Sequence, residues 1–179
     1  MLPISAVETQ RMLINAGIEI ADTNLGIGRQ LTSITSHPRI VNITLDKNEN
    51  PDAEINLAYI ITILETLLSV EDQWLLLPRY GSVTDLIPNE STPAPLSILF
   101  DPSERDQLVG LLCQLYNSGE MIHYDVYILG HNCQVMAAWD HHVFQDGMSV
   151  RLNNVEQSNR LITSLNAIGA EFNVYYTSA

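Results

Sequence analysis

The sequence predicts an α+β fold in which helices pack on one face of a mainly antiparallel sheet. Three observations indicate this fold. Apolar residues recur at helical spacing over residues 52–70 and again after residue 102, alternating apolar residues over residues 121–152 are typical of strands, and glycine-containing turns separate those strands. The chain has 179 residues, 46% of them hydrophobic, which suffices for one core. We therefore expect a single globular domain over residues 1–179.

A short helix is predicted near the start of the chain. Ser5 and Glu8 have the spacing of a capping box, in which each side chain accepts a hydrogen bond from the other residue's backbone N–H. Gly17 supplies a stop signal after this helix, ahead of a segment with strand character. Residues 22–37 are polar and give no clear pattern, whereas the alternation over residues 41–45 predicts a strand.

A long and mostly buried helix is predicted over residues 52–70. Its leucines and isoleucines recur at spacings of three and four residues and leave only a narrow polar stripe. The apolar run 74–77 predicts a buried strand that ends at Pro78, because proline has no N–H to donate to a neighbouring strand. The prolines between residues 88 and 95 predict a long connection after that strand.

Two later helices have clear start signals. Asp101 can cap a helix that begins at Pro102, and Glu104 has the spacing to complete a capping box. One residue of the pair Asn153-Asn154 is predicted to cap the last helix. An aromatic-rich segment over residues 172–176 follows it and predicts a final strand, which we expect to join the sheet.

A meander of antiparallel strands is predicted in the second half of the chain. Its strands span residues 121–129, 132–144 and 148–152. Gly130-His131 has the Gly-X form of a two-residue hairpin turn, and Asp146-Gly147 is a second turn signal. These turns organise the second half of the predicted sheet.

The two turns also predict which residues of the meander share a face. They set Leu129 opposite Asn132 and Gln145 opposite Met148, and alternate residues of a strand then point to opposite faces. One face is uniformly apolar, so we expect helices to cover it. The other face is mixed and is predicted to be an exposed surface that could meet a partner; it carries His123, Asp125, Tyr127, Gln134, Met136, Ala138, Asp140, His142 and Arg151.

An excess of acidic residues is the strongest compositional feature. The chain has 21 aspartates and glutamates against 8 lysines and arginines, which gives a net charge of −13. An acidic exterior repels nucleic-acid phosphates and anionic lipid headgroups, so we expect neither a nucleic acid nor a membrane as a partner. The same field would attract a basic protein, although acidity can also serve only to keep a protein soluble.

Cysteine content and the start of the chain predict a compartment. Cys113 and Cys133 are too few for a disulfide framework, and both lie in segments predicted to be buried. The first residues have neither the basic nor the apolar region of a signal peptide, and no apolar run is long enough to span a bilayer. We therefore expect a soluble, cytoplasmic protein with free thiols.

Asp140-His141-His142 is the segment that best fits a metal or catalytic site. Imidazole and carboxylate groups are ligands for zinc and iron. Adjacent strand residues point to opposite faces, however, so His141 and His142 cannot bind one ion unless a bulge intervenes. A carboxylate could orient His142 for acid–base catalysis, but the sequence offers no matching nucleophile. We predict no metal, no cofactor and no catalytic residues.

The favoured hypothesis is a small acidic binding protein. It would be an immunity protein or inhibitor that neutralises a basic protein such as a nuclease toxin, with His123, Asp125, Tyr127, Asp140 and His142 as partner-binding residues. A less favoured alternative is a small hydrolase-type enzyme that uses His142 or His123 with Asp140. A third is a structural subunit whose exposed apolar groups build a homo-oligomer.

Overall fold

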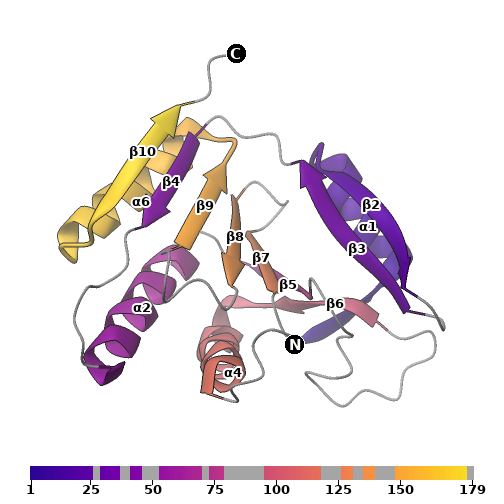
Figure 1. The fold of residues 1–179 in the computed structure, drawn as a ribbon, viewed down its shortest axis with the longest axis horizontal. Coiled ribbons are helices and arrows are strands. Elements are labelled where there is room, and N and C mark those ends of the chain that lie inside the picture. Colours follow the sequence, from indigo (N-terminus) through magenta and orange to yellow (C-terminus); the bar gives the residue numbers. More distant parts are fainter. Residues whose placement is uncertain are drawn as a thin grey trace.

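The computed structural model describes residues 1–25, 29–36, 41–45, 53–69, 73–78, 95–117, 126–130, 135–139 and 148–176. These residues form helices and two sheets (Figure 1). The larger sheet has eight strands in the order β1-β6-β5-β7-β8-β9-β4-β10, and all neighbours are antiparallel. In sheet order the strands are Leu2–Ser5, Pro95–Phe100, Trp74–Pro78, Val126–Gly130, Val135–Trp139, Met148–Leu152, Val41–Leu45 and Phe172–Tyr176.

The α+β prediction with a meander in the second half is confirmed. Strands β7, β8 and β9 are consecutive in the chain and adjacent in the sheet. The strands predicted over residues 41–45 and 172–176 are β4 and β10, with the predicted bounds. The segment with strand character after Gly17 begins β2, which spans Glu19–Leu25 and pairs antiparallel with β3, Arg29–Ser36, in a small second sheet. The sequence did not predict β1, β3 or β6.

The helices begin where the capping residues predict. They are α1 over Ala6–Asn15, α2 over Ala53–Leu68, α4 over Arg105–Asn117 with a preceding 3₁₀ turn over Pro102–Glu104, and α6 over Val155–Ala167. The Ser5 hydroxyl accepts a hydrogen bond from the Glu8 N–H at 3.3 Å. Asn154 is the cap of α6, because its side-chain oxygen accepts from the N–H groups of Glu156 and Gln157 at 2.8 and 3.3 Å. These bonds satisfy N–H groups that a helix start would otherwise leave unpaired.

The larger core lies between the sheet and the helices α2, α4 and α6. The helices contribute Ile63, Leu64, Leu67 and Leu68 of α2, Leu108 and Leu112 of α4, and Leu161 and Leu165 of α6. Alternate residues of strands β4 to β9 meet them, because successive side chains of a strand point to opposite faces. We call this face of the sheet the first face. The prediction that helices cover the apolar face is confirmed.

A second core covers part of the opposite, second face. Helix α1 lies there, and the buried residues are Ile4, Leu13, Ile18, Leu75, Leu77, Tyr127, Leu129 and Met136. A polar contact fixes the position of α1: the hydroxyl oxygens of Thr9 and Ser97 lie 2.6 Å apart, and both residues are fully buried. The helix predicted from Ser5 and Glu8 therefore closes a face that the sequence predicted to be open.

The register of the meander differs from the prediction. Leu129 pairs with Met136, four residues beyond the predicted Asn132, and Leu152 pairs with Val135, six residues before the predicted His141. Gly130 belongs to β7 and pairs with Trp74, so the two-residue turn at Gly130-His131 is wrong. Both offsets are even, and an even offset returns each side chain to the same face. The predicted division of the described meander residues into two faces therefore holds.

Candidate partner-binding surface

Most of the predicted partner-binding residues lie outside the described residues. These are His123, Asp125, Asp140 and His142. The predicted binding role of these four residues stays a prediction. The hydrolase alternative depends on three of them and is equally untested. Tyr127 is the predicted site residue that the structure describes, and it lies in the second strand position of β7.

Tyr127 is part of a core and not of a surface. Its exposed fraction is 8%, and it packs within the second core under α1. In the sheet it lies between Leu77 of β5 and Ala138 of β8. The expectation that this part of the second face is exposed is therefore wrong, because Tyr127 lies in the second core, to which α1 contributes Leu13. We accordingly remove Tyr127 from the residues that could meet a partner.

The sequence did contain a signal for this second cover. The run Trp74-Leu75-Leu76-Leu77 is apolar at every position, and a strand of that kind is typical of a sheet covered on both faces. In the structure Trp74 and Leu76 belong to the first core, whereas Leu75 and Leu77 belong to the second. A cover on the second face of β5 could therefore have been inferred from this continuous run, and the second core, to which α1 contributes Leu13, is that cover.

The second face changes character beyond β8. In β9 the residues Met148, Val150 and Leu152 are buried in the first core, but Ser149 and Arg151 between them are half-buried. In β10 Asn173 is exposed, as is Tyr175 with an exposed fraction of 58%. Strands β9, β4 and β10 therefore form a part of the sheet whose first face is packed against the first core. On the second face of this part, the described side chains of β9 and β10 are half-buried or exposed. We call it the half-covered part.

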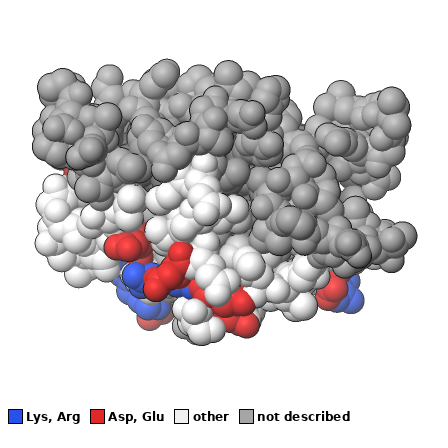
Figure 2. Space-filling view, turned by 90° about the horizontal axis from the view of Figure 1, so that it is seen from below, with Lys and Arg blue, Asp and Glu red and all other residues white. Residues whose placement is uncertain are grey.

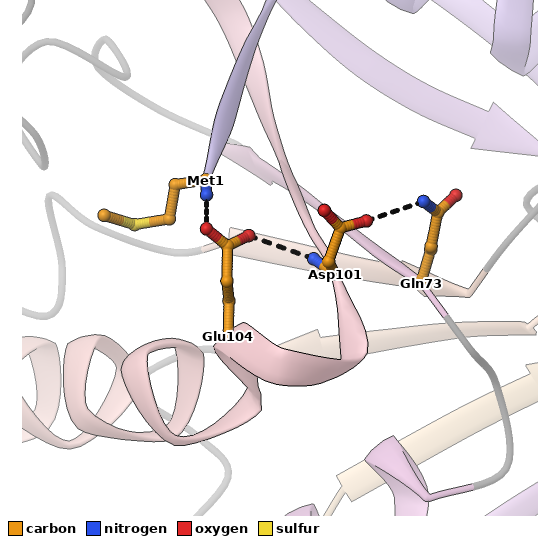
Figure 3. A network of polar contacts seen from close by, with 4 residues as sticks. All are labelled: Met1, Gln73, Asp101 and Glu104. Atoms are coloured by element: carbon orange, nitrogen blue, oxygen red, sulfur yellow. Dashed lines mark hydrogen bonds and ion pairs between the residues drawn. The ribbon is translucent and has the colours of Figure 1, made fainter.

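Acidic side chains near the start of α4 are engaged in local structure. Figure 3 shows the Glu104 carboxylate between the Met1 ammonium group, with which it forms an ion pair, and the Asp101 N–H, which donates to it at 3.1 Å. The Asp101 carboxylate accepts a hydrogen bond from the Gln73 side chain at 2.7 Å. These contacts tie the first residue of the chain and the start of β5 to the start of α4. Both carboxylates thus hold the fold together whatever they contribute to binding.

Acidic and basic side chains lie together on part of the described surface. On the one face that Figure 2 draws, several acidic side chains are visible, with basic side chains beside some of them. On α1 the charged groups of Glu8 and Arg11 are 3.3 Å apart. Exposed pairs of this kind contribute little to stability.

A cavity of about 250 Å³ lies where α2 ends and α4 begins. It is lined by Leu68, Ser69, Trp74, Phe100, Asp101, Pro102, Arg105 and Leu108. The Trp74 indole N–H donates to the Leu68 carbonyl oxygen at 2.9 Å, so this polar group is already satisfied. Among the described lining residues Arg105 is a cation and Asp101 a carboxylate, and the Ser69 hydroxyl donates to the Thr66 carbonyl oxygen at 2.7 Å.

Cys113 on α4 is a free and half-buried thiol. Burial, and then the negative charge of Glu65 on α2, raise the pKa of the Cys113 thiol above its ordinary value. The thiolate is the reactive form, and a raised pKa makes it scarcer near neutral pH. Burial and Glu65 therefore both disfavour the reactive form of Cys113.

In the part of the chain that the structure describes, no three histidine, cysteine, aspartate or glutamate side chains are grouped so that they could hold a metal ion. None of its helices is both long and apolar enough to cross a membrane. Comparisons of the chain with protein families, curated proteins and solved structures give no match.

Proposed function

We propose that the chain is a small acidic binding protein whose partner is a basic protein. In this proposal it acts as an immunity protein or inhibitor that neutralises a cationic enzyme such as a nuclease toxin. The observation that carries the proposal is a net charge of −13 on a domain whose apolar side chains fill two cores. Because the cores are apolar, charged groups are left at the surface, where their field reaches solvent.

An acidic surface attracts a basic protein over a long range. A strongly charged protein meets a partner of opposite charge more often than a neutral protein would. Added salt weakens this attraction, and at 0.1 M salt the attraction between exposed charges more than about 10 Å apart is largely screened. Exposed acids on separate elements contribute to this field, among them Glu8 on α1, Asp106 on α4 and Glu156 on α6. They support attraction of a basic partner without specifying where it docks.

The docking residues of the proposal are His123, Asp125, Asp140 and His142. They flank β7 and β8 in the sequence, and their carboxylates are the groups that would meet basic side chains. Tyr127 no longer belongs to this set, because it is buried in the second core. The proposal therefore moves the site from the face of the meander to the segments that precede β7 and follow β8.

Capture from a native lysate at low ionic strength, followed by mass spectrometry, would provide the partner for the test. We expect a protein with a basic isoelectric point whose association rate falls steeply as salt is added. The double variant Asp125→Asn/Asp140→Asn should reduce the association rate several-fold. The matched control is Asp106→Asn/Glu156→Gln, which removes two exposed charges from α4 and α6 and should have a smaller effect.

Two results would overturn the proposal. One is a partner that is neutral or acidic, with an association rate indifferent to salt. The other is a basic partner that associates equally fast with the Asp125→Asn/Asp140→Asn variant and with the unmodified protein, because a rate that ignores these two charges contradicts the docking site.

A further inference from the structure

We draw no further inference here: the strongest candidate, the cavity of about 250 Å³ where α2 ends and α4 begins, carries none, because residues 70–72, which lie in the sequence between its lining residues Ser69 and Trp74, are outside the described residues and nothing in the structure shows what covers it.

Discussion

The sheet has two parts that bury their side chains in different ways. In β5 and β7 every residue is buried, because the first core lies on one face and the second core on the other. In β9 buried and half-buried residues alternate, and in β10 no residue is fully buried. The doubly covered part has side chains buried on both of its faces. In the half-covered part, the described side chains of β9 and β10 on the second face are half-buried or exposed.

The largest expected effect comes from a comparison of two tyrosines. Tyr127→Ala removes a buried ring from the second core and should lower the free energy of unfolding by about 3 to 5 kcal/mol. Tyr175→Ala removes an exposed ring from the half-covered part and should change it by less than about 0.5 kcal/mol. Urea unfolding of both dilute variants measures the difference. Equal losses would mean that the two parts of the sheet are not packed differently.

A smaller effect is expected where α1 meets β6. Thr9→Val keeps the shape of the side chain but leaves the Ser97 hydroxyl buried without its partner, which should cost about 1 to 3 kcal/mol. Adding Ser97→Ala should recover part of that loss, because the unpaired hydroxyl is then gone. The free energies of unfolding of Thr9→Val, Ser97→Ala and the double variant, compared with that of the unmodified protein, complete this double-mutant cycle. Strictly additive losses would show that the two hydroxyls are not coupled.

The caps of α1 and α6 allow a finer comparison of the two parts. Asn154→Ala removes an oxygen that accepts two backbone N–H groups at the start of α6, and should cost about 1 kcal/mol. Ser5→Ala removes one such bond, of 3.3 Å, at the start of α1 and should cost less. The midpoint of thermal unfolding is sufficient to rank them. A larger loss for Ser5→Ala would indicate that α1 depends on its cap more than its packing suggests.

The smallest expected effect is a change in the reaction rate of Cys113, which lies on α4, one of the helices that cover the first face. Because the pKa of the Cys113 thiol is raised by burial and by Glu65, its alkylation should be slower than that of an exposed cysteine at neutral pH and should accelerate as the pH rises. Glu65→Gln should lower the pKa and moderately increase the rate. Mass spectrometry of the peptide that contains Cys113 follows the reaction separately from Cys133. An unchanged rate in Glu65→Gln would remove Glu65 as a cause.

The candidate site shows where prediction from sequence failed. The even offsets preserved the faces of the meander, so Tyr127 was correctly assigned to the face opposite the first core. Its exposure was not predictable from its own strand, because exposure depends on whether a distant segment packs above it. The apolar run of β5 indicated such a cover without identifying it, and α1 comes from the first residues of the chain.

Local features of this protein follow from amino-acid order alone. The caps at Ser5, Asp101 and Asn154 and the apolar periodicity of α2 depend on residues a few positions apart. These helices, and strands such as β4 and β10, could therefore be predicted from short windows, whereas β1, β3 and β6 could not. Strand order, register and the cover of each face required the folded chain. They depend on contacts such as that between Thr9 and Ser97, 88 residues apart, whose formation is decided by packing over the whole domain.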